Sequence, residues 1–401
     1  MYLSPAAGRL DACPAASAGS LHLEIVDTIE GLHRLGPEWD NLFQRSGKAH
    51  HVFQQHAFVE LFARAYHLDE VGQAKPGKLA IVTGRRAGRL VLVWPLVEQR
   101  CMGGTAVSWI GEPVAQYGDV LLDAAEPALP SLQKAYAHIL TTLRPDIVRL
   151  RRVRADATIG PLIVHLGARA RCEQGAPCIT LAKGGSGFEQ RQSGKAKKNR
   201  RRQMRRLEER GTISFEEVRD AASIAKAITA GLSDKREWCG QRGLLSAALS
   251  DPRFDTFLQS AACAPGNPAG CVVFSLRLDD RQIAFALAFR CKQRLMLHVI
   301  SYAPDIEKHG PGVLNVEAIL RHAEALGLEA VDMLPPSADY KLDWADTSIE
   351  VCDYSWGVNA RGRMWAALSD GIMRPVVKSA LSRLPHNMRK RLAQRQLPKH
   401  E

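Results

Sequence analysis

One short loop in the second half of the chain carries residues that can bind phosphate. The segment KHGPGVLN places Gly310 and Gly312 at the start of an amphipathic helix expected over about residues 312–326. Glycines let a ligand approach the backbone closely, and the free N–H groups and dipole of a helix start attract phosphate. Because Pro311 lacks an N–H group, the amides of residues 312–314 would form the site. A plain turn before a helix would look the same, so both interpretations stay open.

Positive charge is concentrated in two segments. Residues 191–210 contain ten Lys and Arg against two Glu, and residues 372–401 contain eight against one. Since the net charge of the whole chain is +12, the remainder is close to neutral, unlike a uniformly basic nucleic-acid coat. No aromatic residue occurs in 190–211, so this segment offers attraction to phosphate without base stacking, and DNA is not an expected partner. A solvated helix face is the alternative interpretation.

The nine cysteines are scattered and contain no C-x-x-C motif. This pattern predicts reduced cysteines, with neither a disulfide framework nor a zinc site. His50, His51 and His56 have no acidic or cysteine cluster nearby in the sequence, so they are expected to be structural, and no metal is predicted. The N-terminal residues lack the pattern of a signal peptide, and no apolar run approaches the ~18 residues of a membrane span, which predicts a soluble, cytoplasmic protein.

The apolar residues switch between a period of two and a period of about 3.6, which predicts an α/β (α+β) protein. Each half of the chain contains helices, an antiparallel hairpin, a further strand, a helix and a closing strand in the same order, which favours a duplicated domain. A glycine-rich segment separates the halves. The expected divisions are a disordered tail over 1–20, domains over 21–180 and 181–366, and a basic, partly helical tail over 367–401. That tail either caps the core or lies on anionic lipid as an amphipathic helix.

The strand–loop–helix–strand segment 294–334 resembles the acyl-CoA-binding core of the GNAT acetyltransferase superfamily. The pyrophosphate loop of that superfamily reads (R/Q)-x-x-G-x-(G/A), and this chain supplies both glycines, with Glu307 at the first position. Three further segments are similar to the CelD-like and FemAB-like branch: ADYKLDWAD, the arginine-rich helix followed by LEERGTISFEEV, and HVFQQHAFVELFARAY. The resemblance covers about residues 20–360 and is more specific in the second half.

The resemblance implies two GNAT-like domains in tandem, each with a mixed, mostly antiparallel sheet flanked by helices. The second domain would bind acetyl-CoA, or a related acyl-CoA, as a co-substrate. The strands over 295–302 and 329–334 would diverge, so that backbone groups of the first strand pair with the pantetheine arm. The residues expected to contact the donor are Val299, Ile300, Ser301, Gly310, Gly312, Val313 and Leu314.

Direct attack of an amine on a thioester needs a base for the ammonium, an acid for the leaving thiolate and groups that stabilise charge. The residues implied for these roles are Asp332 or Asp339 as the base, Tyr340 as the acid, and Lys341 beside an anionic group of the acceptor. The residues expected to bind the acceptor are Lys198, Arg201, Arg202 and Trp344.

These features predict an enzyme that transfers an acetyl or related acyl group from acyl-CoA to an amine. The resemblance suggests an amino-sugar or nucleotide-linked precursor of an envelope polysaccharide as the acceptor. A second hypothesis keeps the fold and takes aminoacyl-tRNA as the donor, with the arginines at 200–202 holding the acceptor stem. A third is a non-catalytic scaffold in a polysaccharide-synthesis complex.

Overall fold

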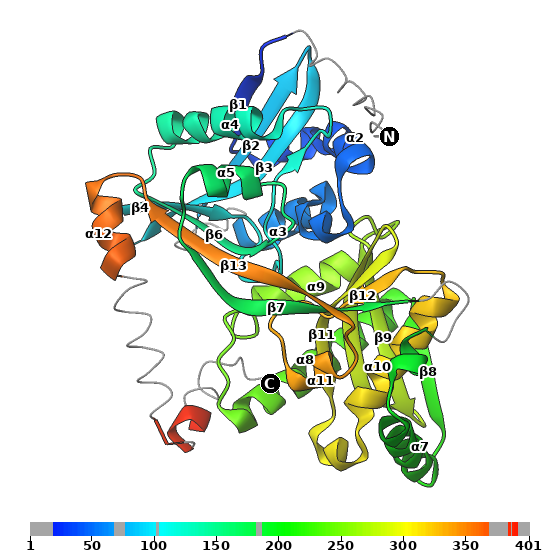
Figure 1. Ribbon diagram of the computed structural model, residues 1–401. Helices are drawn as coiled ribbons and strands as arrows, with labels where there is room; N and C mark the ends of the chain where they lie inside the picture. Colours follow the sequence, from blue (N-terminus) through cyan, green and yellow to red (C-terminus); the bar gives the residue numbers. More distant parts are fainter. Residues whose placement is uncertain are drawn as a thin grey trace, which may run out of the picture.

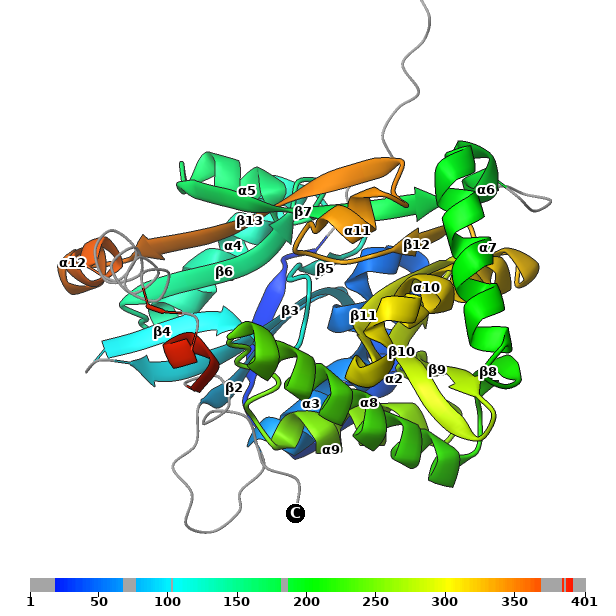
Figure 2. The same ribbon diagram turned by 90° about the horizontal axis from the view of Figure 1, so that it is seen from below.

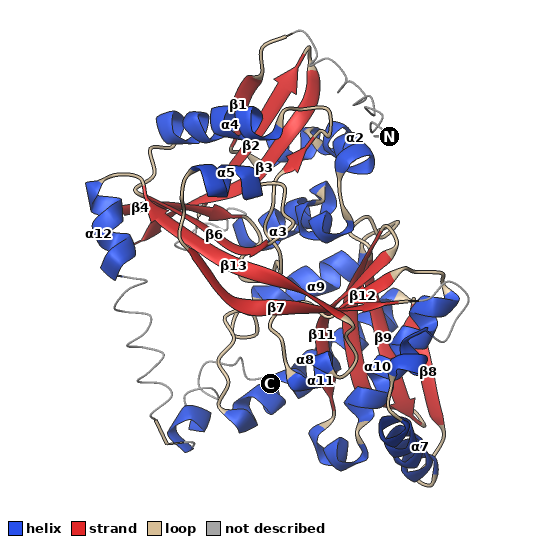
Figure 3. Cartoon of the chain, viewed as in Figure 1, coloured by secondary structure: helices blue, strands red, loops and turns tan. Residues whose placement is uncertain are grey.

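A single mixed sheet runs through both halves of the chain in the computed structural model (Figures 1 and 3). The structure describes residues 19–67, 77–101, 104–181, 187–368, 384–385 and 387–391. The strands of the first half are β1 (His22–Val26), β2 (Lys78–Arg86), β3 (Arg89–Cys101), β4 (Gly104–Trp109), β5 (Leu121–Leu122), β6 (Ile147–Arg154) and β7 (Ala170–Thr180). Those of the second half are β8 (Ile213–Val218), β9 (Cys271–Leu278), β10 (Arg281–Cys291), β11 (Arg294–Tyr302), β12 (Ala330–Asp332) and β13 (Thr347–Gly357).

The strand order is symmetric about the middle of the sheet. It reads β1-β2-β3-β4-β6-β13 and continues as β7-β12-β11-β10-β9-β8, with β5 beside β3. β4 and β6 are parallel in the first half, as are β11 and β12 in the second, and the other pairs are antiparallel. Between the parallel strands the chain forms α4 (Ala128–Thr142) or α10 (Pro311–Ala325). The expected tandem α/β arrangement with a mostly antiparallel sheet is therefore confirmed.

The two halves exchange a strand at the centre of the sheet. β13 from the second half pairs with β6, β7 from the first half pairs with β12, and β7 and β13 pair with each other. A disulfide joins Cys172 of β7 to Cys352 of β13. The expectation that all cysteines are reduced is therefore wrong for this pair. The two residues are 180 positions apart in sequence, and only the pairing of the exchanged strands brings them together.

Helices cover both faces of the sheet (Figure 2). One face carries α1 (Ile29–Arg34), α2 (Gly36–Ser46), the 3-10 helix η1 (Ala49–Gln54), α3 (His56–His67), α8 (Ala221–Arg242) and α9 (Arg253–Cys263), whose apolar side chains form one core that spans both halves. In that core the ring centroids of Phe58 and Phe257 lie 5.2 Å apart. On the other face, α4 and α5 (Gly160–His165) cover the first half, and α10 covers the second. The shared core fixes the position of the halves relative to each other.

Local sequence sets where three helices of the second half, α7, α8 and α10, begin. α7 (Gly194–Glu208) is capped by Ser193, whose hydroxyl accepts a hydrogen bond from the amide of the N3 residue at 3.1 Å. The carboxylate of Asp220 caps α8 in the same way at 2.9 Å. α10 follows the 3-10 helix η2 (Pro304–His309), and Gly310 stands between them with a φ of 66°. This left-handed conformation favours glycine.

The remaining helices are α6 (Gly187–Arg191), α11 (Asp339–Leu342) and α12 (Ala360–Leu368). The predicted N-terminal tail lies outside the described residues apart from Gly19 and Ser20, and so does most of the predicted C-terminal tail. The described segment 387–391 is helical and contacts Gly243 at the end of α8. In the part of the chain that the structure describes, no helix combines the length and the apolarity needed to cross a bilayer.

Candidate active site

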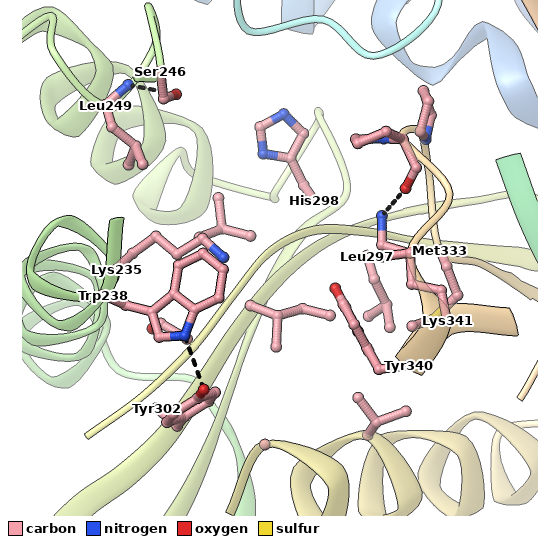
Figure 4. Close-up of a pocket in the computed structure, with 18 of the residues that line it drawn as sticks. Lys235, Trp238, Ser246, Leu249, Leu297, His298, Tyr302, Met333, Tyr340 and Lys341 are labelled. Atoms are coloured by element: carbon pink, nitrogen blue, oxygen red, sulfur yellow. Dashed lines mark hydrogen bonds between the residues drawn. The ribbon is translucent and has the colours of Figure 1, made fainter. Parts of the chain in front are cut away.

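A pocket opens where β11 and β12 separate. The two strands pair in parallel only between residues 294–296 and 330–332, and β12 then ends while β11 continues to Tyr302. On its other side β11 stays paired with β10. No strand of the described residues therefore pairs with the edge of residues 297–302 that faces away from β10, as the resemblance implied. The pocket beside this edge has a volume of about 600 Å³ (Figure 4).

Both halves of the chain contribute to the walls of this pocket. One wall is β11 from residue 297 to 302, and a second is the loop and helix start at 310–313. A third wall follows β12 and contains residues from 333 to 341, while α8 and the segment before α9 close the opposite side. Gln116 and Arg152 come from the first half. The pocket is thus a composite site.

The predicted glycine loop borders the pocket, and close packing explains both glycines. A Cβ at Gly310 would overlap the side-chain amide of Gln203 on α7, and a Cβ at Gly312 would lie 2.9 Å from the Tyr302 ring. The amides of Val313 and Leu314 both donate to the carbonyl of Gly310, at 3.1 and 3.2 Å. No described residue accepts a hydrogen bond from the Gly312 amide. Of the three amides at 312–314 that were expected to bind phosphate, that of Gly312 therefore remains available to a ligand.

Glu307, which replaces the Arg or Gln of the superfamily loop, is held by a cation. The Arg242 guanidinium donates to Glu307 at 2.6 Å, and the Tyr302 hydroxyl donates to the same carboxylate at 2.7 Å. The Tyr302 hydroxyl and then Arg242 lower the pKa of Glu307. Arg242 also lies 4.4 Å from the ring centroid of Trp238, which itself donates to the Tyr302 oxygen. The negative charge at this position is thus balanced.

Tyr340 and Lys341 both face the pocket from α11 (Figure 4). Burial raises the pKa of Tyr340 to about 12, with a smaller contribution from nearby Tyr302. The Lys341 ammonium donates to the carbonyls of Leu334 and Pro336 at 2.7 and 3.0 Å. Burial, reinforced by the positive charge of Lys235, lowers the pKa of Lys341 to about 8.

The two aspartates predicted as bases do not line the pocket. Asp332 is 1% exposed and turns toward the first half, where the Tyr117 hydroxyl lies 2.9 Å from both of its oxygens and the Arg154 guanidinium lies 3.3 Å away. Burial raises the pKa of Asp332 against the opposing effect of Arg154. Asp339 is exposed at the first position of α11. Asp332 therefore joins the halves, and neither carboxylate is placed to take a proton from a molecule in the pocket.

The residues predicted to bind the acceptor also lie outside the pocket lining. Trp344 is 4% exposed and packs between Phe188 and the Arg200 guanidinium, which is 4.6 Å from its ring centroid. Arg200 is buried and paired with Glu317 at 2.9 Å. The other predicted residues occupy the exposed side of α7: Lys198, Arg201 and Arg202.

Sequence reasoning missed His298, whose ring lines the pocket (Figure 4). In the pairing of β11 with β10, Leu287 faces Val299 and Ala288 faces Leu297, so His298 is the extra residue of a β-bulge. Its Nε2–H donates to the carbonyl of Val114 at 2.9 Å, and its Nδ1 has no described partner. Burial, with a smaller effect of Arg152, lowers the pKa of His298 to about 4. The ring is therefore neutral, and the lone pair of its buried Nδ1 accepts no hydrogen bond from a described residue.

A second group of histidines lies in the first half. His50 and His51 were expected to lack an acidic neighbour, but Asp119 lies beside both, and the three ligand atoms are within 4.8 Å of one another. His51 Nδ1 accepts from the Lys48 amide at 3.0 Å, so its Nε2 carries the proton that it donates to Asp119 at 2.8 Å. Asp119 also accepts from backbone amides such as that of Thr158. This arrangement fits a hydrogen-bonded structural cluster better than a metal site, because Nε2 is protonated.

Residues 194–342 match the model of the acetyltransferase (GNAT) domain family. This stretch runs from the start of α7 to the end of α11, and it contains most of the pocket lining. The second half is therefore similar to a GNAT domain, and the resemblance to this superfamily is confirmed. No protein of curated function matches the chain in sequence.

Solved structures of the same two-domain fold extend the similarity to most of the chain. FemX is 9% identical, with a TM-score of 0.55 over 83% of this chain and 98% of that one. The C-terminal domain (DUF2156) of a putative lysylphosphatidylglycerol synthetase from Agrobacterium fabrum is 11% identical, with a TM-score of 0.52 over 84% and 97%. L-PGS from Bacillus licheniformis is 12% identical, with a TM-score of 0.50 over 79% and 90%. At these identities the similarity establishes the fold.

Proposed function

We propose that this protein is an acyltransferase that moves an acyl group, such as acetyl, from acyl-CoA to an amine. The observation that supports this most directly is the position of the pocket. It lies where β11 leaves β12, it includes the glycine loop before α10, and most of its lining falls within the GNAT match. The CelD-like sequence resemblance alone supports a narrower class of acceptor, namely an amino sugar or a nucleotide-linked precursor of envelope polysaccharide.

The donor would bind along β11. The Gly312 amide and the N-terminal dipole of α10 would attract the diphosphate, while Arg242 removes the repulsion that Glu307 would otherwise exert. The unpaired edge of residues 297–302 offers N–H and C=O groups to the amides of the pantetheine arm. A donor bound in this way would carry its thioester toward the part of the pocket that holds His298 and Lys341.

Three residues that line this part of the pocket would supply the base, the acid and the positive charge that the transfer requires. The acceptor nitrogen would attack the thioester carbonyl, so that a C–N bond forms and the C–S bond breaks. The nitrogen becomes acidic as the C–N bond forms, and His298 Nδ1 would accept its proton. Tyr340, with a pKa of about 12, keeps its proton at neutral pH and can give it to the leaving thiolate. The Lys341 ammonium, fixed by two carbonyls, would stabilise the negative charge on the oxygen.

A second candidate keeps the site and replaces the donor with an aminoacyl-tRNA. The exposed cations of α7, which include Lys198, Arg201 and Arg202, favour this alternative because α7 packs against the glycine loop through Gln203. A polyanion on that face would lie next to the mouth of the donor site. Replacing Arg201 and Arg202 by Glu should abolish tRNA binding under this alternative, and should leave the affinity for acetyl-CoA within twofold under the first.

Isothermal titration with acetyl-CoA tests the proposed donor. We expect a Kd of tens of micromolar or tighter, about −6 kcal/mol. Gly312→Trp should nearly abolish binding, because even a Cβ at this position meets the Tyr302 ring at 2.9 Å. Gly160→Trp is the matched control, since a Cβ there meets no atom within 4 Å.

The proposal fails if the parent protein does not bind acetyl-CoA, or if Gly312→Trp binds it as well as Gly160→Trp does. An RNase-sensitive gel shift with charged tRNA would then support the second candidate. If the protein binds neither acetyl-CoA nor charged tRNA, the result would favour the third hypothesis, a non-catalytic scaffold.

A further inference from the structure

Arg152 reaches the pocket from the first half because of an irregularity in β6. In the pairing of β6 with β13, Val153 faces Cys352 and Leu150 faces Tyr354, so two residues of β6 stand opposite Asp353. Arg152 has a φ of 55°, a left-handed conformation that costs a residue with a side chain roughly 1–2 kcal/mol. Its amide donates to the Asp353 carboxylate at 2.9 Å, which holds the bulge in place. Strained bulges of this kind re-aim side chains and are frequent at functional sites.

The guanidinium of Arg152 forms no direct ion pair with a described residue, although the carboxylates of Glu112 and Asp353 act on it from nearby. One of its nitrogens donates to the Ala115 carbonyl at 2.7 Å, and the side chain lines the pocket. Among the described residues no carboxylate forms an ion pair with it. The neighbouring Arg151, by contrast, is paired with Glu112 at 3.4 Å, and Arg154 is paired with a carboxylate of its own. A partly buried cation without a direct ion pair is costly, which suggests that a ligand supplies a closer negative charge.

The other charged side chains that line the pocket are two lysines and one carboxylate that is already paired. Lys235 lines it with its ammonium 4.8 Å from the ring centroid of Trp238, and Lys341 is held by carbonyl groups. The carboxylate of Glu307 also lines the pocket, and Arg242 neutralises it. Among the described residues that line it, the pocket therefore has an excess of positive charge and offers no unpaired carboxylate to a purely cationic amine.

We propose, building on the acyl transfer proposed above, that the acceptor carries a carboxylate or phosphate group close to its amino group and that Arg152 binds this acidic group. His298 and Arg152 line the same pocket, so an acceptor whose acid group rests on Arg152 presents its nitrogen to His298. The acceptor class is thus an amino acid, a phosphorylated amine or a larger molecule that ends in one of these. A neutral amino sugar would leave Arg152 unpaired.

Titration of product analogues onto the complex of the protein with CoA tests this proposal without requiring turnover. The probes are N-acetylglycine against N-acetylglycinamide, and N-acetyl-O-phosphoethanolamine against N-acetylethanolamine. Each pair differs only in the acidic group. We expect the acidic member of at least one pair to bind at least tenfold more tightly, and the pair with the larger ratio identifies carboxylate or phosphate.

Substitution of the arginine then assigns the preference to Arg152. Arg152→Gln should abolish the ratio, Arg152→Lys should retain part of it, and Arg151→Gln, the matched control, should leave it unchanged. Acetyl-CoA should bind all three variants within twofold of the parent, which shows that they are folded. Equal binding of both members of each pair, or an unchanged ratio in Arg152→Gln, overturns the assignment while acetyl-CoA binding still supports the transferase. Loss of acetyl-CoA binding by the parent instead rejects the underlying function.

Discussion

His298 and Arg152 stand at β-bulges on different strands, and their side chains line the same pocket. His298 belongs to β11 in the second half, and Arg152 belongs to β6 in the first. Arg152 lies close enough to lower the pKa of His298 electrostatically. A bulge interrupts the alternation of a strand. In each half of the sheet, a β-bulge therefore directs one polar side chain into the pocket where the two halves meet.

Replacing His298 by Phe should slow transfer without weakening donor binding. The ring sits among Phe53, Phe254 and Phe289, so Phe keeps the aromatic packing. It removes the lone pair of Nδ1 together with the hydrogen bond from Nε2–H to the Val114 carbonyl. We expect the single-turnover rate with acetyl-CoA to fall by about 10²–10⁴-fold, as for loss of a general base. His165→Ala, on the surface of α5, serves as the control. An unchanged rate in His298→Phe would mean that the proton leaves by another route.

The stability of the fold should fall in weak acid. The pKa values of His50 and His298 are about 4 in the folded protein, below the ordinary histidine value of 6.5, mainly because both rings are desolvated. The unfolded chain therefore binds more protons between pH 6.5 and 4, so the free energy of unfolding is greatest above pH 6.5 and decreases toward pH 4. Each histidine contributes at most about 3 kcal/mol over this range. Urea unfolding from pH 7 to pH 4.5 should show the decrease, and His298→Phe should reduce its slope; equal slopes would exclude a contribution of His298.

Tyr117→Phe should weaken the junction between the halves. The Tyr117 hydroxyl donates to Asp332, a buried carboxylate that also pairs with Arg154. Removing this donor from a buried acceptor should lower the free energy of unfolding by about 1–3 kcal/mol. Tyr354→Phe is a suitable comparison, because no described residue hydrogen-bonds its hydroxyl. Similar urea midpoints for the two variants would contradict the structural importance of this contact.

The disulfide between Cys172 and Cys352 should contribute to stability, because it closes a loop of 180 residues. Replacing both cysteines by Ser should lower the free energy of unfolding by about 2–4 kcal/mol, and dithiothreitol should have a comparable effect on the parent. Cys263→Ser removes a free, partly exposed thiol and should change little. Mass spectrometry of the alkylated, unreduced protein provides a direct check, and free thiols at both positions would refute the bond.

Much of the fold could be predicted because its signals are local. The continuous apolar runs of β2 and β3 and the apolar stripe of α10 identify these elements without tertiary information. β7 and β13 could not be predicted in this way. They are more polar than the neighbouring strands, and each is stabilised by pairing with a strand from the other half of the chain.

The contrast between local and long-range signals also explains which site residues could be predicted from the sequence. Gly310, Gly312, Tyr340 and Lys341 follow from motifs within one segment, and the structure places all four on the pocket. The orientation of Asp332 depends on Tyr117 and Arg154, which are 215 and 178 positions away. His298 and Arg152 have no sequence signal, because a bulge exists only when the partner strand is in register.

The exchange of β7 and β13 ties the two described halves together at the centre of the sheet. Because each half supplies an inner strand to the other, and one apolar core spans both, the halves cannot swing apart without breaking the ladders at β6–β13 and β7–β12. We therefore expect the pocket between the halves to keep its shape when ligands enter and leave. Catalysis in such a molecule would depend on a preformed pocket rather than on closure of one half over the other.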